Sequence, residues 1–193
     1  MSRAVCKRLG EVMNKIVNAL LFQACWFSAV MHSWELAMAP LLCLLGHSVW
    51  KERGQHDYLG LAALVTFGLA FDTFMFQLGI FVSPSQEVAA VLGMPLWLMA
   101  MWCAFSLTLS SSLSWYTRFP RVFIGVTALA GPLSYWGGMR LGALTIEPVG
   151  FVLLAFEWGL IAYMVVRFLG KPKSHSAQKV PLGHNAKLAS FQS

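Results

Sequence analysis

Long hydrophobic runs make up most of the chain, and polar residues gather between them and at the two ends. A membrane-spanning helix needs about 20 predominantly apolar residues. Six runs reach or approach this length: Ile16–Ser33, Leu36–Trp50, Tyr58–Val82, Val88–Ser114, Val122–Gly138 and Val149–Val166. Because the runs are continuous and do not alternate between polar and apolar positions, they favour helices over the strands of a membrane barrel. We therefore predict an all-α, polytopic integral membrane bundle of about six transmembrane helices.

The two ends of the chain differ from the runs. In residues 1–15, apolar positions recur at helical spacing opposite basic ones, which predicts an amphipathic segment on the cytoplasmic face. Residues 16–168 hold the six predicted spans. Because the first run is longer than the apolar core of a signal peptide, about 7–15 residues, we expect it to be retained. Residues 169–193 are rich in Gly, Pro, Ser and Lys, which is typical of a basic, disordered tail.

Composition and charge agree with this picture. Hydrophobic residues make up 58% of the chain and charged residues 11%, whereas a soluble domain carries about 25% charged residues. This excludes a conventional soluble globule, a soluble coiled coil and a disordered chain. The formal net charge of +6 does not indicate nucleic-acid binding, because the bases lie at the ends and in short connectors. Of the 14 lysines and arginines, only Arg140 falls on the outer side of a six-span arrangement, so both termini are predicted to be cytoplasmic.

Cysteine and histidine give little sign of a metal or a redox centre. The four cysteines form no C-x-x-C pair, so neither a disulfide framework nor a zinc site is expected. His32 and Glu35 lie three residues apart but lack a third ligand nearby. No nucleophile elbow, phosphate loop or dinucleotide fingerprint is present. We predict no metal, no cofactor and no catalytic residue, and this weighs against an enzyme without settling the matter.

Asp72 is one of two acidic residues inside the apolar runs. A charged side chain at the bilayer centre costs roughly 2.5–3.5 kcal/mol even on the insertion scale, so such positions are candidates for function. Gly68, one turn earlier, and Gly79, two turns later, share the predicted helix face of Asp72. Because small residues allow helices to approach closely, we expect Asp72 to point into the bundle. An ion pair with Arg140 is one interpretation, and a role in transport or catalysis is the other.

Glu157 is the second acidic residue, near the middle of the last run and without a base at comparable depth. Burial without a counter-charge favours the neutral form of a carboxyl group. A neutral Glu157 can hydrogen-bond Gln23, which lies near the middle of the first run. That bond is one interpretation, and a proton-coupled site or a contact to a ligand headgroup is the other. The candidate binding positions are therefore Asp72, Glu157, Arg140 and Gln23.

Several motifs stand out between Asn18 and Arg167. They are Asn18-Ala19-Leu20-Leu21-Phe22-Gln23, Leu69-Ala70-Phe71-Asp72, Pro95-Leu96-Trp97, Ser112-Leu113-Ser114-Trp115 and, most specific, Gly131-Pro132-Leu133-Ser134-Tyr135-Trp136-Gly137-Gly138 running into Arg140-Leu141-Gly142-Ala143. With these motifs the chain resembles an uncharacterised bacterial inner-membrane family, domain of unknown function 2878. The resemblance implies a multi-pass protein of the bacterial inner membrane with no assigned activity, and it supplies no site residues.

Three functions of different classes fit these features. The first is a small permease-like protein that binds a solute, a proton or a lipid, with Asp72 and Glu157 as polar anchors. The second is an accessory or structural subunit of an inner-membrane complex, in which the same acids only lock helices together. The third is a membrane enzyme that modifies a lipid or quinone. We favour the first, and we expect the lipid bilayer as a partner, with a bound lipid or another membrane subunit left open and nucleic acid excluded.

Overall fold

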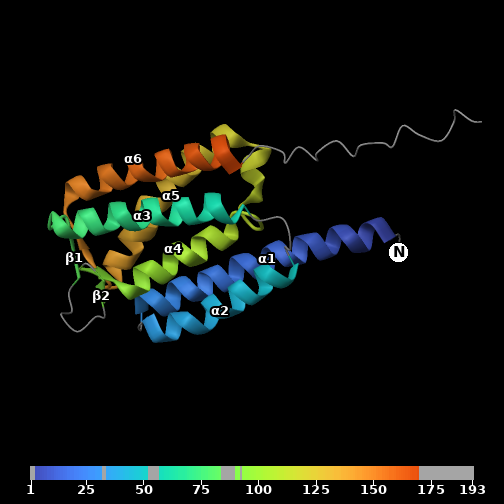
Figure 1. Ribbon diagram of the computed structural model, residues 1–193, viewed down its shortest axis with the longest axis horizontal. Coiled ribbons are helices and arrows are strands. Elements are labelled where there is room, and N and C mark those ends of the chain that lie inside the picture. The colour runs from blue at the N-terminus through green and yellow to red at the C-terminus, as the bar shows by residue number, and fades with distance from the viewer. Residues whose placement is uncertain (1–2, 32–33, 52–56, 84–89, 92, 170–193) are drawn as a thin grey trace, which may run out of the picture.

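The computed structural model describes residues 3–31, 34–51, 57–83, 90–91 and 93–169. Within them six α-helices alternate in direction along one bundle (Figure 1): α1 (Arg3–Met31), α2 (Trp34–Lys51), α3 (Tyr58–Gln77), α4 (Leu96–Thr108), α5 (Pro120–Arg140) and α6 (Pro148–Met164). Two shorter helical segments follow α4 and α6, namely η1 (Ser114–Thr117) and η2 (Val165–Leu169). The start of α1 and the end of α6 lie at the same end of the bundle (Figure 1).

Short strands lie at the end of the bundle opposite the start of α1 (Figure 1). They are β1 (Phe81–Val82), β2 (Ala90–Val91), β3 (Met94–Pro95) and β4 (Thr145–Ile146). The segment after α3 pairs with the segment before α6, because β1 is antiparallel to β4 with Phe81 opposite Ile146. Strands β2 and β3 form a second antiparallel pair just before α4. The fold is thus mostly helical, as predicted, with small strand pairs that the hydrophobic pattern did not indicate.

The predicted spans are confirmed only in part. Three segments are long and apolar enough to cross a membrane: Tyr58–Gln77, Pro120–Arg140 and Pro148–Leu169. Two further apolar helices are shorter, at Glu35–Trp50 and Leu96–Thr108. The number of membrane crossings and the cytoplasmic position of the termini remain predictions. The predicted tail from residue 170 onward lies outside the described residues.

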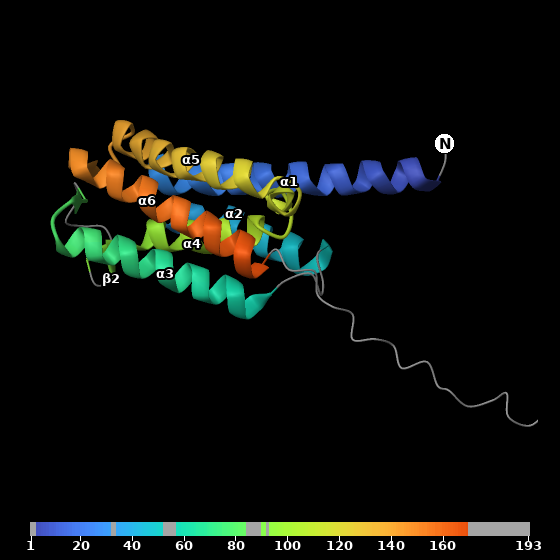
Figure 2. The same ribbon diagram turned by 90° about the horizontal axis from the view of Figure 1, so that it is seen from above.

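The N-terminal segment and the first predicted span form a single helix. Helix α1 runs without a break from Arg3 to Met31, so residues 3–15 continue directly into the predicted first span. Its first half extends beyond the rest of the bundle (Figure 2). The apolar side chains of Val5, Leu9 and Val12 are all about half exposed there. The predicted row of apolar side chains is therefore present, and it lies on the first part of a long helix that continues into the bundle.

The predicted run Val88–Ser114 is much longer than the helix it contains. Helix α4 covers only Leu96–Thr108. It begins directly after Pro95, which is in an extended conformation, and proline has no backbone N–H to donate within a helix. At the other end the hydroxyl of Thr108 donates to the carbonyl of Phe105 at 2.6 Å. Serine and threonine hydroxyls compete with the backbone in this way, and α4 ends in a series of turns before η1.

Gly79 does not share the buried face of Asp72, contrary to our expectation. Helix α3 ends at Gln77, and Gly79 follows with φ of +70°. Its N–H donates to the Phe76 carbonyl, and the N–H of Ile80 donates to the Met75 carbonyl, which together form a Schellman motif. Gly142 ends α5 in the same way, with φ of +82°. The two glycines terminate helices because left-handed backbone strains other residues.

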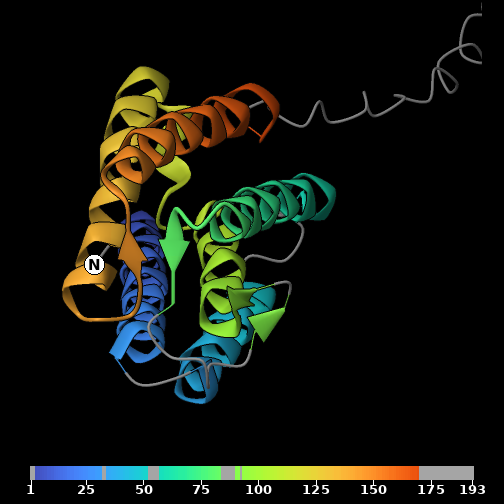
Figure 3. The same ribbon diagram turned by 90° about the vertical axis from the view of Figure 1, so that its left-hand side faces the viewer.

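The helices pack in a definite order around the bundle. Helix α1 packs mainly on α2, and α5 mainly on α6. Helix α4 contacts α1, α2 and α3, and α3 in turn contacts α6. The view along the helices shows α3 and α6 together above α1 and α2 (Figure 3). Helices α1, α2 and α4 therefore contact one another, and from α4 the series of neighbours continues through α3 and α6 to α5.

Candidate functional site

Asp72 lies at the centre of the helical bundle. Its side chain on α3 is completely buried, so the prediction that it points into the bundle is confirmed. Oδ2 accepts a hydrogen bond from Nε1 of Trp102 on α4 and another from the hydroxyl of Tyr135 on α5, both at 2.6 Å. Oδ1 is buried without a hydrogen-bond partner among the described residues. One carboxyl group thus links three helices.

Both hydrogen bonds to Asp72 converge on Oδ2. Hydrogen bonds from a hydroxyl to a carboxylate are typically 2.5–2.7 Å long, shorter than those between neutral groups. The Tyr135 hydroxyl lies within that range at 2.6 Å, and the indole N–H of Trp102 is equally close. Two donors that converge on one oxygen stabilise a negative charge on it. The carboxylate is therefore held by neutral donors.

Glu157 of α6 is the second buried carboxyl group, with 1% of its surface exposed. It lies close enough to Asp72 for the two carboxyl groups to interact electrostatically. Neither of its oxygens has a hydrogen-bond partner among the described residues. A buried carboxylate with neither a donor nor a cation beside it is strongly disfavoured. This environment fits the neutral form of Glu157, as the sequence predicted.

Two tryptophans stack next to Asp72, and each lies against a glycine. Trp102 and Trp158 have ring centroids 5.3 Å apart and planes within 13° of each other. The ring of Phe105 meets both edge-on. A Cβ atom at Gly68 of α3 would overlap the Trp102 ring, and one at Gly131 of α5 would overlap the Trp158 ring. The absence of a side chain at these two positions is what lets the rings lie against the helix backbones.

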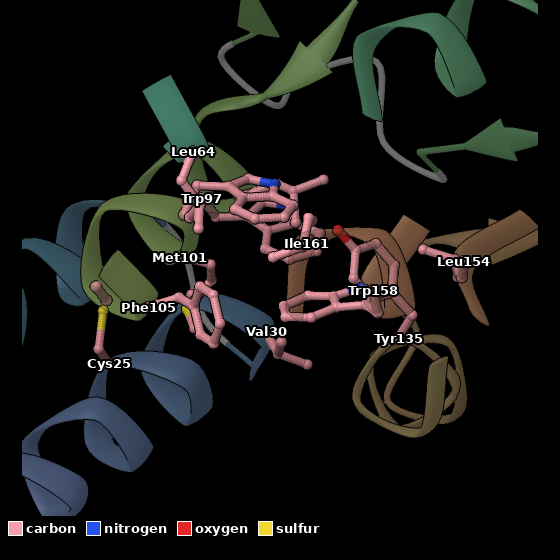
Figure 4. Packing of buried hydrophobic residues seen from close by; sticks show 14 of the residues in the cluster. Cys25, Val30, Leu64, Trp97, Met101, Phe105, Tyr135, Leu154, Trp158 and Ile161 are labelled. Atoms are coloured by element: carbon pink, nitrogen blue, oxygen red, sulfur yellow. The ribbon is translucent and has the colours of Figure 1, made fainter. Parts of the chain in front are cut away.

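A cavity of about 410 Å³ lies between α1, α4, α5 and α6. Most of its wall is apolar, and the polar side chains on it are Gln23, Ser134 and Tyr135. Figure 4 shows Tyr135 close to Trp158 on the neighbouring helix, with Phe105 of α4 on the other side. Seven aromatic residues line the cavity: Phe22, Trp26, Trp97, Trp102, Phe105, Tyr135 and Trp158. Both hydrogen-bond donors to Asp72 therefore belong to the cavity wall.

The cavity opens on the flank of the bundle. Gln23 of α1 and Leu133 of α5 line it and are both exposed. Each lies about two helical turns from the end of its helix, so the opening faces sideways. Nearer the ends of these helices Trp26 and Gly137 also line the cavity, and the Trp26 ring approaches the position of a Cβ at Gly137 to 3.4 Å. The exposed lining residues Gln23 and Leu133 thus place an open side of the cavity at α1 and α5.

The remaining sequence-predicted contacts are not formed. Arg140 is exposed, and its guanidinium lies over the Trp136 ring at 5.8 Å from the centroid. The hydrogen bonds of Asp72 come from Trp102 and Tyr135 instead, so the structure does not show the Asp72–Arg140 ion pair. Gln23 does not bond Glu157, whose oxygens have no partner in the described part of the chain. Gln23 lines the cavity instead.

The sequence did not identify the aromatic residues of the site as functional. Tyr135 occurs in one of its motifs, but nothing in a hydropathy pattern shows that Trp102 and Tyr135 reach Asp72 on another helix. The spacing of Gly131 and Tyr135 at one helical turn was the available signal. No group of three or more potential metal ligands is present among the described residues. His32, part of the weak metal hypothesis, lies outside them.

Comparison with known proteins places the chain in a family without assigning an activity. No curated protein and no solved structure matches it. A family model described as "Protein of unknown function (DUF2878)" matches residues 15–164. That range includes both buried carboxyl groups and every residue that lines the cavity. The match covers most of the sequence and confirms the resemblance seen in the motifs, so this chain belongs to the DUF2878 family.

Proposed function

We propose that this protein is a multi-pass protein of the bacterial inner membrane that binds a small, mainly apolar molecule in the cavity between α1 and α5. One observation carries the proposal: an apolar cavity opens on the flank of the bundle and has the hydrogen-bonded Tyr135–Asp72 pair at its wall. Ligand cavities typically have volumes of about 300–1,000 Å³ and apolar walls with a few placed polar groups. The volume of about 410 Å³ fits this range.

The outer surface supports a membrane location. Large apolar side chains on α5 and α6 are strongly exposed, with Leu129 at 68%, Val152 at 70% and Phe156 at 70%. Contiguous apolar surface of this kind is rare on soluble monomers, whereas lipid chains would cover it. In a membrane, the sideways opening of the cavity would face the lipid. A ligand would then enter from the bilayer, which favours a molecule that partitions into lipid.

A structural role within a larger membrane complex is the second candidate. It is favoured by the way Asp72 joins α3, α4 and α5 through Trp102 and Tyr135, because such a link stabilises a bundle whether or not a ligand binds. It does not account for the cavity, which leaves open space beside these residues. The two candidates therefore predict different results for a variant in which a side chain fills the cavity. Only the first predicts that a bound molecule is lost.

Replacing Ala130 with tryptophan tests the proposed function. Ala130 lines the cavity, so the new indole should occupy it and remove a bound molecule. Native mass spectrometry of the protein in mild detergent should show a small molecule on the unmodified protein and none on Ala130→Trp. Leu129→Trp is the matched control, because Leu129 is 68% exposed and does not line the cavity. If all three proteins carry the same adduct, or none carries one, the cavity is not the binding site.

Single cysteines test the predicted orientation. In a variant without its native cysteines, an impermeant maleimide added to intact cells should label Arg140→Cys, because Arg140 is exposed at the end of α5 that is predicted to be external. Lys173→Cys, in the tail outside the described residues, should react only after the membrane is opened. Labelling of Lys173→Cys in intact cells would overturn the orientation.

A further inference from the structure

The chemistry of the cavity wall points to a class of ligand. We infer that the cavity binds a lipophilic cation, meaning an apolar molecule that carries an ammonium group or a similar shielded positive charge. The inference rests on the proposed function, because it requires that the cavity is a binding site. It adds the sign of the ligand's charge and the residues that select it.

Aromatic rings on the cavity wall are the first support. A cation is attracted to the face of an aromatic ring within about 6 Å of its centre, most strongly to tryptophan. Trp102 and Trp158 cover each other's faces by stacking. Trp26, Trp97 and Phe22 also line the cavity and are not part of that stack. These three rings are the ones that can turn a face towards a bound cation, as in sites that recognise quaternary ammonium groups.

The charges around the cavity are the second support. None of the described residues that line it is a lysine, arginine or histidine. The carboxylate of Asp72 lies directly behind the wall, hydrogen-bonded to two lining residues, Trp102 and Tyr135. Arg140 is exposed and lies over Trp136, which does not line the cavity. In an apolar environment the attraction between opposite charges is much stronger than in water, so a cation in the cavity would stabilise the ionised form of Asp72, whereas an anion would oppose it.

The unpaired carboxyl oxygens are the third support. Oδ1 of Asp72 and both oxygens of Glu157 are buried, with no hydrogen-bond donor among the described residues. The indole N–H of Trp158 on the cavity wall is likewise buried without a partner among the described residues. No basic side chain in the described part of the chain lines the cavity, so a bound cation would be attracted to the carboxyl oxygens behind the wall without competition from a resident positive charge. An anionic headgroup such as a phosphate would face the same acceptors without a basic partner, which disfavours it.

Two probes of the same shape and opposite charge test the inference. Tetraphenylphosphonium and tetraphenylborate are added to the purified full chain in detergent, and binding is followed by equilibrium dialysis. The Ala130→Trp variant, treated in the same way, measures uptake by the detergent alone. After this correction the cation should bind saturably, with at least about tenfold higher affinity than the anion. Binding of a neutral probe, N-phenylnaphthylamine, is measured alongside to test whether the cavity binds an uncharged molecule.

Variants at Gln23 decide whether charge selects the ligand. Gln23 is exposed at the cavity opening, so substitutions there should fold even where changes to Asp72 do not. We expect Gln23→Lys to lower the affinity for tetraphenylphosphonium at least about tenfold through charge repulsion. Gln23→Met, of similar size and neutral, should leave it nearly unchanged. Neither variant should change binding of the neutral probe by more than about twofold.

The possible results separate this inference from the proposed function. If the neutral probe binds in the cavity but the cation binds no better than the anion, the inference is wrong and the proposed function stands. If Gln23→Lys and Gln23→Met bind the cation equally well, the cavity does not select by charge, and the inference also fails. If none of the probes distinguishes the unmodified protein from Ala130→Trp, the cavity is not a binding site and both proposals fail.

Discussion

Replacing Asp72 with alanine should destabilise the protein by about 2–6 kcal/mol, because the change leaves two buried donors without an acceptor at about 1–3 kcal/mol each. The donors are the indole N–H of Trp102 and the hydroxyl of Tyr135, which both bond Oδ2 of Asp72 at 2.6 Å. The midpoint of thermal unfolding in detergent, followed by fluorescence, should fall by on the order of 10 °C. Tyr135→Phe removes only one of the two bonds and should give a smaller decrease.

Arg140→Ala is the control for this prediction. Arg140 is exposed and lies over the Trp136 ring, so its removal should change the unfolding temperature little. If Arg140 instead balanced the buried charge of Asp72, its removal would leave that charge unpaired at a cost of about 3–5 kcal/mol. An equal loss of stability in Arg140→Ala and Asp72→Ala, with recovery in the double variant Asp72→Asn/Arg140→Ala, would contradict the hydrogen-bonded arrangement.

Gly131→Ala should also destabilise the protein strongly, although alanine is normally the better helix former by about 1 kcal/mol. The added methyl group would overlap the ring of Trp158. That ring cannot move aside freely, because Trp102 stacks on its other face at a centroid distance of 5.3 Å. Overpacking of this kind costs about 1–3 kcal/mol. Gly68→Ala should behave in the same way, since its methyl group would overlap the Trp102 ring.

Gly125→Ala is the matched control on the same helix. Nothing lies within 4 Å of a Cβ atom at Gly125, so alanine there should leave stability unchanged or raise it. Unfolding temperatures of the two variants are measured under the same conditions. A decrease for Gly131→Ala, together with no decrease for Gly125→Ala, indicates the contact with Trp158. If Gly131→Ala is as stable as Gly125→Ala, the tryptophans are not packed against these helices as described.

The sequence predicted the burial of Asp72 but not what holds it. The position of Gly68 one turn before Asp72 correctly indicated a face in close contact with other helices. The predicted partner was wrong because Arg140 is the one base that the sequence places on the outer side, and a count of charges alone favours an ion pair. In the folded chain two neutral donors bond one oxygen of the carboxyl group, and they come from α4 and α5. Which side chains meet across three helices depends on packing that hydropathy does not encode.

Helix ends and the cavity were the other limits of prediction. Gly79 looked like part of a packing face, but it ends α3 because its φ of +70° belongs to a Schellman motif. The apolar run around α4 was taken as one span, although Pro95 and the hydroxyl-rich segment after Thr108 shorten the helix. The cavity draws residues from four helices, so no single stretch of sequence shows it. Of the aromatic residues on its wall, only Phe22, Trp97 and Tyr135 belong to the motifs that carry the family resemblance.

Photolabelling tests most directly whether the cavity binds a molecule from the lipid phase. A lipophilic amine with a diazirine group is added to membranes that contain the full chain, irradiated, and its adducts are mapped by peptide mass spectrometry. Labelling should concentrate on the segments Phe22–Val30 and Ala130–Gly138, which line the cavity, and an excess of unlabelled amine should remove it. Labelling that is spread over exposed residues such as Leu129 and Phe156, and that no competitor removes, would contradict a binding cavity.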